Sequence, residues 1–403
     1  MSADPRFRAD LCATVLAGYC AGRTRSVLRL YYPSMRLLRV VLVNVAVAGV
    51  LATVGCSPGY VARAAYEEAR ILQNRRPIEE VIHDTATASV VRHKLRLVRD
   101  ARYFAVNDLG LDAGKSFESF ARVDRDTLLM VVSAAPPYQL AWKTWWFPIV
   151  GRVPYRGYFN TSQAHDLARK LKQDGYDVYL RPSVAFSTLG WLPDPLLSSM
   201  LLADSVSLVE TVIHEITHTT YFPRGEVQFN ESFANFVGHR GAIEFFCDVA
   251  VDRELCEAAR ARWHDSRVLG RFYRSVYAAL GELYAGSTAV SSAAGGATSE
   301  DSIATGKRAI LDRAVRQFTD EIRPQLLAGD YRAPDPEQLN NAWLMARVLY
   351  YERLGDFDAV YERFGDLAPA LEAIIRESKA SSPWEALDHL SRGGTTDRET
   401  PTE

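Results

Sequence analysis

The stretch VETVIHEITHTTYF, residues 209–222, decides how this chain arranges its functional side chains. His214 and His218 stand four positions apart, and residues at that spacing share one face of an α-helix. Asp204 or Ser205 is a suitable N-cap. Apolar residues supply the opposite face, namely Val206, Val209, Ile213 and Ile216. The pattern predicts a helix that anchors to a core and presents two imidazoles to one metal ion.

A catalytic zinc ion needs a third protein ligand and an open position for water. Glu231 follows thirteen residues after His218. It lies in the stretch VQFNESFANFVGH, residues 227–239, in which we expect a second helix to begin at about Asn230. The intervening chain is long enough for a turn and for a helix packed alongside the first. His239 lies on the same face as Glu231 but about 12 Å further along the axis, which is too far to share the ion. We therefore expect one Zn²⁺ per chain, held by His214, His218 and Glu231.

Glu215 is the expected general base. A zinc-bound water has a pKa near neutrality, so Glu215 takes its proton and the resulting hydroxide attacks a carbonyl that the same ion polarises. This chemistry is metal-dependent hydrolysis.

The segment that begins Asn230-Glu231 resembles the third-ligand helix of the gluzincins, the thermolysin-like peptidases. In that group an aspartate one turn beyond the glutamate supports a ligand histidine, and here Asn235 stands at that position and can accept from a ring N–H. Gluzincins also stabilise the oxyanion with a Tyr or His. The candidates for this role are Tyr155, Tyr158, Tyr221 and Tyr350. Of these four tyrosines we nominate Tyr155 and Tyr158.

The chain has 403 residues and a formal charge of −2, with 47 basic and 49 acidic residues, which gives no electrostatic reason to expect a nucleic-acid partner. Two of its five cysteines, Cys247 and Cys256, could form a disulfide only if a turn interrupts the helix between them.

Two arginines and a run of apolar or small residues from Val40 to Gly55 precede Cys56, which is the layout of a secretory signal. Residues 53–56, Thr-Val-Gly-Cys, resemble the bacterial lipobox, although Thr53 stands where Leu is usual. This resemblance implies that residues 1–55 are a leader and that Cys56 carries lipid. We expect a bacterial cell-envelope protein that is anchored to the membrane at Cys56 and faces the periplasm or the exterior. An uncleaved anchor helix is the alternative.

Periodicity predicts an α+β protein that is mostly helical, with a small mixed sheet before the helix that bears the two histidines. This architecture is zincin-like. In chain order, we expect a leader (1–55), an N-terminal helical region (57–126), a zincin-like catalytic core (127–284), a flexible Ala/Ser/Gly-rich loop (285–306), a C-terminal helical region (307–392) and a disordered tail (393–403).

Several longer motifs resemble bacterial lipoproteins described as predicted aminopeptidases. These motifs are GCSPGY, RRPIEEV, KTWWFPIVGRVPYRGYF, FSTLGWLPDPLLSSML, HEITH, FNESFA and LNNAWL. The resemblance implies a zinc peptidase that removes N-terminal residues from peptides in the envelope. In zincin folds the substrate commonly pairs with an edge strand before the metal helix, and residues 182–191 are either that strand or an ordinary core strand. Glu226 or Asp194 could hold the ammonium group of the peptide. An envelope metalloendopeptidase and a non-catalytic binding protein with the same fold are the alternatives.

Overall fold

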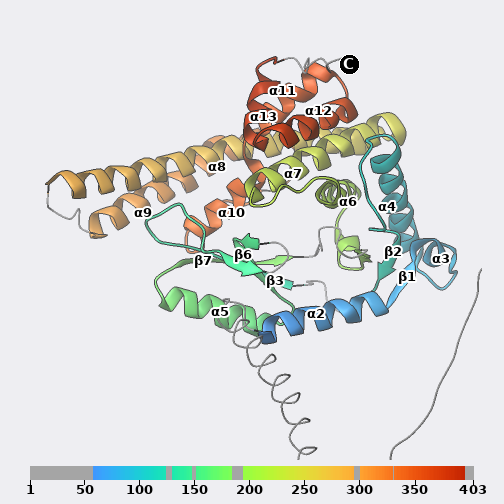
Figure 1. Cartoon of the computed structure of the whole chain (residues 1–403), viewed down its shortest axis with the longest axis horizontal. Coiled ribbons are helices and arrows are strands. Elements are labelled where there is room, and N and C mark those ends of the chain that lie inside the picture. Colours follow the sequence, from blue (N-terminus) through green and yellow to red (C-terminus); the bar gives the residue numbers. More distant parts are fainter. Residues whose placement is uncertain are drawn as a thin grey trace, which may run out of the picture. The chain divides into compact units, whose positions relative to one another are not determined.

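The described part of the chain is mostly helical with small sheets, as the sequence predicts for an α+β protein (Figure 1). The computed structural model describes residues 58–123, 129–147, 151–183, 194–294, 300–329 and 331–394, all within the unit Gly55–Glu403. The predicted leader, the lipidation site Cys56 and residues 395–403 of the predicted tail lie outside these ranges. No helix in the described ranges combines the length and the apolar character that crossing a membrane requires.

Helix α6 (Ser205–Thr220) carries the two histidines and begins where the sequence predicts. The Asp204 side chain accepts a hydrogen bond from the Ser207 backbone N–H at 3.0 Å, which caps the helix. Helix α7 (Val227–Glu244) follows after a short turn and packs against α6. Its buried aromatic residues, Phe229, Phe233 and Phe236, belong to the largest hydrophobic core of the unit.

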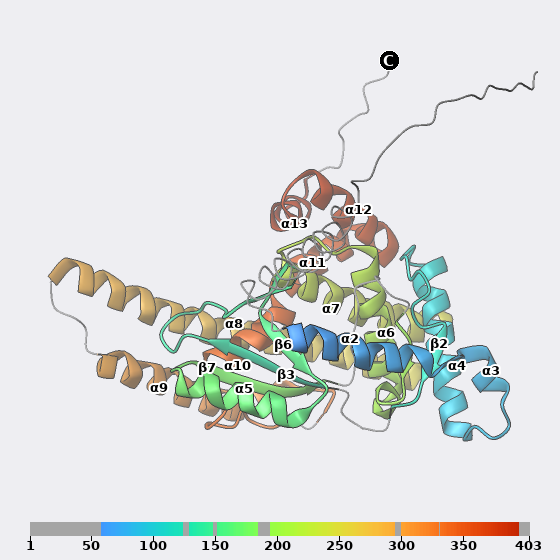
Figure 2. The same ribbon diagram turned by 60° about the horizontal axis from the view of Figure 1, so that its bottom comes forward.

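The strands of the described ranges precede α6. One antiparallel sheet has the order β6-β3-β7, a second sheet has the mixed order β1-β2-β8, and β4 pairs with β5. Their bounds are β1 Arg75–Pro77, β2 Ser119–Ala121, β3 Leu129–Ala135, β4 Trp145–Phe147, β5 Gly151–Val153, β6 Tyr155–Tyr158, β7 Asp177–Ser183 and β8 Leu196–Leu197. Helix α5 (Thr161–Gln173) covers one face of the β6-β3-β7 sheet, and α10 (Asn341–Tyr351) packs on the strands from the other side (Figure 2).

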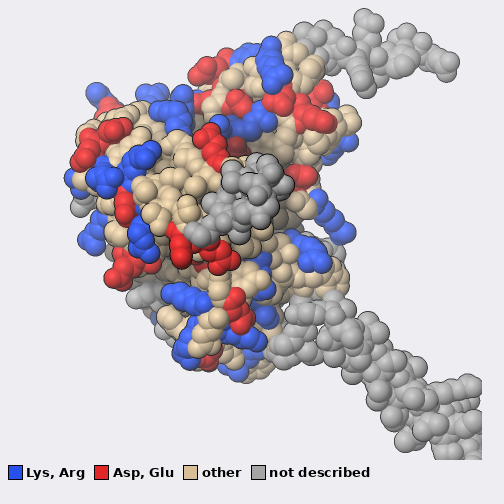
Figure 3. Space-filling view, turned by 90° about the vertical axis from the view of Figure 1, so that its left-hand side faces the viewer, with Lys and Arg blue, Asp and Glu red and all other residues tan. Residues whose placement is uncertain are grey.

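The remaining helices surround this centre. They are α2 (Pro58–Gln73), α3 (Ile78–His83), α4 (Ser89–Asn107), α8 (Arg253–Ala294), α9 (Glu300–Gln317), α11 (Leu354–Phe364), α12 (Leu367–Ala380) and α13 (Pro383–Ser391). The largest core joins α4, α6 and α7 to α11, α12 and α13. Where Figure 3 shows described residues, acidic and basic side chains are interspersed on this face.

The loop expected at residues 285–306 is largely helical. Helix α8 continues to Ala294 and α9 begins at Glu300, and residues 295–299 lie outside the described ranges. Alanine has the highest helix propensity, so an Ala-rich run needs little apolar bulk to continue a helix. Gly306 is a contact residue between the two helices, because a Cβ there would lie 2.9 Å from Leu283 Cδ1.

A disulfide joins Cys247 and Cys256, whose Cα atoms lie 4.9 Å apart. The required interruption of the helix is present, because a π-helical turn over Phe245–Val249 ends α7 and Val251 takes a positive φ of 51° before α8 begins. Without that turn, the nine-residue separation would place the two thiols far apart on one helix.

Candidate metal centre

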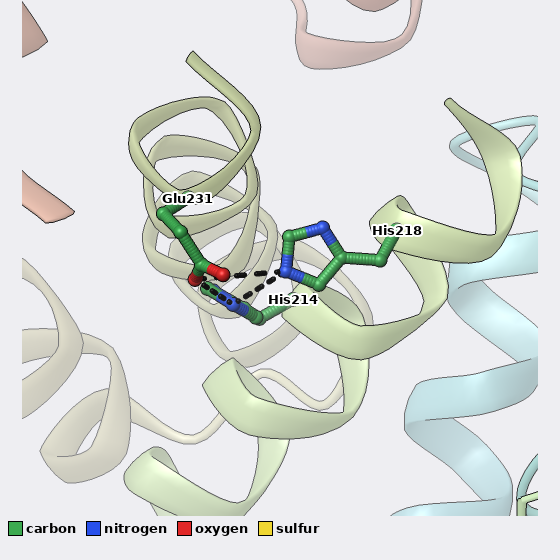
Figure 4. A group of neighbouring side chains, drawn as sticks. All are labelled: His214, His218 and Glu231. Carbon is green, nitrogen blue, oxygen red and sulfur yellow. Dashed lines mark hydrogen bonds and ion pairs between the residues drawn. The ribbon is translucent and has the colours of Figure 1, made fainter. Parts of the chain in front are cut away.

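His214, His218 and Glu231 converge, although they come from two helices (Figure 4). The Nε2 atoms of the two histidines lie 3.1 Å apart. Glu231 Oε2 lies 3.5 Å from the Nε2 atom of His214 and 3.7 Å from that of His218. The potential ligand atoms all lie within 4.8 Å of one another, so this group could hold a metal ion.

Close packing of α6 on α7 brings the glutamate to the histidines. Gly238 lies at a close approach of the two helices, because a Cβ at this position would lie 2.7 Å from the Glu210 carbonyl oxygen and 3.4 Å from His214 Cβ. Both Glu210 and His214 belong to α6, so Gly238 permits the helix spacing on which the group depends.

Glu231 is buried at 8% exposure and remains charged. Desolvation is the largest single influence and acts to raise its pKa, but the neighbouring imidazoles of His214 and His218 outweigh it and hold the pKa well below the usual range of a glutamate. A buried carboxylate with two imidazoles is a donor set suited to a divalent cation. His218 Nδ1 is buried and has no hydrogen-bond partner in the described part of the chain.

Tyr155 and Tyr350 lie at this centre. Desolvation and then the negative charge of Glu231 raise the pKa of both phenols, and Glu215 acts on both in the same direction. Each hydroxyl therefore keeps its proton at neutral pH and can donate a hydrogen bond. The ring of Tyr350 lies 6.3 Å from that of His214. Glu215 follows His214 in α6 and is partly buried.

The structure places Tyr158 and Tyr221 elsewhere. Residues three apart in a strand point to opposite faces, so Tyr158 packs with the α5 side of the sheet while Tyr155 packs with the helices of the metal centre. The Tyr221 hydroxyl donates to the Ser378 carbonyl at 3.1 Å, which identifies this residue as an anchor for α12. The nomination of Tyr158 as the oxyanion donor is therefore not supported by its position.

Asn235 has a different contact from the one expected. Its Nδ2 donates to the Tyr350 carbonyl at 2.8 Å, so it fixes α10 to α7. The amide is thus used as a donor to the backbone of the helix that carries Tyr350. The sequence pattern could not show this contact because the partner lies 115 residues away.

His239 is held away from the metal centre, as its spacing predicts. Its Nδ1 lies 2.7 Å from Glu210 Oε1, and its Nε2 lies 3.0 Å from Ser266 Oγ. These contacts resemble a Ser-His-Glu triad in order, but Ser266 sits within α8, where the backbone N–H groups are used by the helix and supply no oxyanion donors. We interpret the three residues as a polar clamp between α6, α7 and α8.

Arg181 is a residue of this region that sequence reasoning did not single out. Its Nη2 donates to the Tyr350 hydroxyl at 3.4 Å. The only signal in the sequence is the alternation of strand DVYLRPS, which puts Tyr179 and Arg181 on one face. Nothing in that pattern indicates that the face points toward a metal centre.

The proposed substrate strand falls mostly outside the described ranges. Residues 182 and 183 end β7, which is an edge strand, and residues 184–193 are not described. Asp194 is buried, and its carbonyl accepts from the Phe117 backbone N–H at 2.9 Å, beside the sheet that contains β2 and β8. Glu226 stands at the N-terminal end of α7. Their suggested role in binding an ammonium group stays a prediction.

Comparison with known proteins gives one finding. Residues 59–387 match the sequence model of a family described as "Putative aminopeptidase". No curated protein and no solved structure matches the chain. The match covers the sheets, the metal centre and the helices that surround them.

Proposed function

Because the chain belongs to the "Putative aminopeptidase" family, we propose that it is a zinc-dependent aminopeptidase of the gluzincin type. The observation that carries the proposal is the convergence of His214, His218 and Glu231. Two histidines and a glutamate, with one position left for water, are the ligand set of catalytic zinc in several metallopeptidases.

The distances within the group fit a tetrahedral zinc ion. Ligand atoms that lie 2.0–2.1 Å from such an ion are separated from one another by about 3.3–3.4 Å. The three separations of 3.1, 3.5 and 3.7 Å bracket that value. His214, His218 and Glu231 would therefore hold zinc with small side-chain movements.

The chain's own residues supply the remaining chemistry. When bound, the ion supplies an activated water and polarises the scissile carbonyl. Glu215 accepts the proton of the attacking water and returns it to the departing amine. Tyr350 and Tyr155 keep their phenolic protons and can donate a hydrogen bond to the negative charge that develops on the carbonyl oxygen.

The proposed location is the cell envelope, with lipid at Cys56 as the anchor. Support comes from the signal-like N-terminal sequence and from the disulfide between Cys247 and Cys256, because disulfides persist mainly outside the cytoplasm. Peptides in the envelope would be the substrates.

The test combines metal analysis with activity. We expect one zinc per chain in the purified protein, loss of zinc and activity in His218→Ala, and retained zinc with about 10²- to 10⁴-fold lower activity on leucine amide in Glu215→Gln. His165→Ala, an exposed histidine of α5, is the matched control and should keep both zinc and activity. A folded wild-type protein without metal would refute the proposal, and cleavage of N-terminally blocked peptides would favour an endopeptidase.

A further inference from the structure

Arg181 of strand β7 lies beside the metal centre, on the sheet face that packs against helix α10. Tyr179 and Arg181 lie two residues apart and share the face of the sheet that carries Tyr155, as the pairing of both outer strands with β3 requires. Helix α10 covers this face, where the Tyr350 hydroxyl lies 3.4 Å from Arg181 Nη2 and Arg347 Nη2 lies 3.4 Å from the Tyr179 hydroxyl.

Arg181 offers more hydrogen-bond donors than the described part of the chain satisfies. A guanidinium group has five N–H donors, and the hydrogen bond found for Arg181 is the single long one to Tyr350. Within the described ranges, no carboxylate forms an ion pair with it. Desolvation, the largest single influence, lowers the pKa of Arg181, but its interactions with Tyr350, Tyr155, Tyr179 and Glu231 give a net upward shift, so the group is charged.

The balance of charge favours an anionic group of the substrate. Glu231 and Glu215 contribute two negative charges. A bound divalent ion and Arg181 would contribute three positive charges, so these four groups together would carry one net positive charge. A guanidinium beside a reaction centre is suited to a carboxylate, which it can bind through two parallel hydrogen bonds.

We propose that Arg181 binds a carboxylate of the peptide substrate. A carboxylate close to the scissile bond has two sources, namely the C-terminus of a dipeptide or an acidic side chain in the residue after the bond. In either case Arg181 determines specificity and does not take part in bond cleavage. This inference rests on the proposed peptidase function and adds the substrate class.

Binding in the Glu215→Gln background tests the inference without turnover. The three probes are Leu-Leu, Leu-Leu-amide and Leu-Glu-amide, measured by titration calorimetry on the zinc-loaded protein. We expect one of the two carboxylate probes to bind about 10- to 100-fold more tightly than Leu-Leu-amide. The probe that gains affinity identifies the source of the carboxylate. Arg181→Met should remove the preference, and Arg181→Lys should retain part of it.

Kinetics in the otherwise wild-type protein separate specificity from catalysis. Arg181→Met should raise KM about 10- to 100-fold for the preferred carboxylate substrate, with kcat and the hydrolysis of leucine amide little changed. Arg347→Met is the matched control, because this arginine also contacts one tyrosine hydroxyl, but that of Tyr179 and not that of Tyr350. It should leave the preference unchanged.

The inference and the proposed function fail differently. Equal affinity for all three probes, with zinc bound and leucine amide hydrolysed, would overturn the role of Arg181 alone. An equal fall of kcat on charged and neutral substrates in Arg181→Met would also overturn it, because the arginine would then act on the reacting carbonyl. Absence of both zinc and hydrolysis in the wild type would remove the proposed function and the inference together.

Discussion

Tyr350 reaches the metal centre from a helix that follows α6 by more than a hundred residues. Asn235 fixes the backbone of Tyr350 to the helix that carries Glu231, and Arg181 contacts its hydroxyl. The backbone of Tyr350 is thus tied to the helix that carries Glu231, which makes Tyr350 the better placed of the two tyrosines for the proposed hydrogen bond to the substrate.

Tyr350→Phe tests this role. Removal of one donor that stabilises a developing oxyanion lowers kcat by about 10²- to 10³-fold, and zinc content should not change. The same substitution at Tyr158, on the opposite face of the sheet, should change kcat by less than about twofold because this residue packs against the α5 side. A larger loss for Tyr155→Phe than for Tyr350→Phe would assign the donor to β6.

At the scale of elements, the spacing of α6 and α7 determines whether the three ligands can meet. The two helices contribute His214 and His218 on one side and Glu231 on the other, and Gly238 permits their close approach. Helix α7 also supports the next layer, because its last residue, Glu244, accepts a hydrogen bond from the Leu367 backbone N–H at the start of α12 at 3.1 Å.

Gly238→Ala should force the two helices apart. Insertion of a methyl group into a packed contact costs about 1–3 kcal/mol, and we expect zinc to bind more weakly because Glu231 moves away from the histidines. Gly286→Ala is the matched control, because a Cβ there meets nothing within 4 Å and alanine favours the helix. Urea unfolding and zinc titration of both variants provide the comparison, and unchanged zinc affinity in Gly238→Ala would contradict the argument.

Glu244 should make stability depend on pH. Burial and then repulsion from Asp366 raise the pKa of Glu244 to about 7. The folded state therefore holds a proton that the unfolded state releases between about pH 4.5 and 7, and stability falls as the pH rises through this window.

Glu244→Gln removes that dependence and keeps a hydrogen-bond acceptor for Leu367. At pH 5 the variant and the wild type should have about the same free energy of unfolding. At pH 8 the free energy of unfolding of the variant should be higher by about 1 kcal/mol, a value that is reduced because Glu244 is partly exposed. Glu282→Gln, on an exposed part of α8, should show no such difference. Equal stability of the Glu244→Gln variant and the wild type at both pH values would show that the carboxyl group is not perturbed.

At the scale of the whole described unit, a buried carboxylate joins three helices. Asp358 of α11 is 2% exposed and contacts Arg240 of α7, Trp263 Nε1 of α8 at 3.2 Å, and Arg267 of α8 at 2.8 Å. The helices that cover the metal centre are therefore connected to the C-terminal helices through one charged group and the aromatic core around it.

Asp358→Ala should leave two arginines and an indole N–H without their acceptor. Loss of one partner from a buried ion pair costs about 3–5 kcal/mol, which urea unfolding would measure. Asp356→Ala, which removes the partly exposed partner of Arg353, should cost less than about 1 kcal/mol. Comparable losses in the two variants would mean that burial does not distinguish them.

The local part of the metal centre follows from the sequence. Spacing by four and the Asp204 cap predict a helix with His214 and His218 on one face, and a short connection makes Glu231 a reachable third ligand. The sequence predicts a loop at residues 285–306 because the segment has little apolar bulk, but most of it is helical. The high helix propensity of alanine outweighs the lack of apolar bulk.

Only the tertiary structure decided which side chains from distant segments face that centre. Tyr350 and Arg181 meet across 169 residues of sequence, and Tyr155 rather than Tyr158 points inward because of the face that the sheet turns toward the helices. Such contacts depend on how sheets and helices pack, whereas the spacing of residues in one helix is fixed by its 3.6-residue turn. The sequence by itself therefore predicted the helix and the three residues of the candidate metal centre, and only the fold placed Tyr155, Tyr350 and Arg181 beside them.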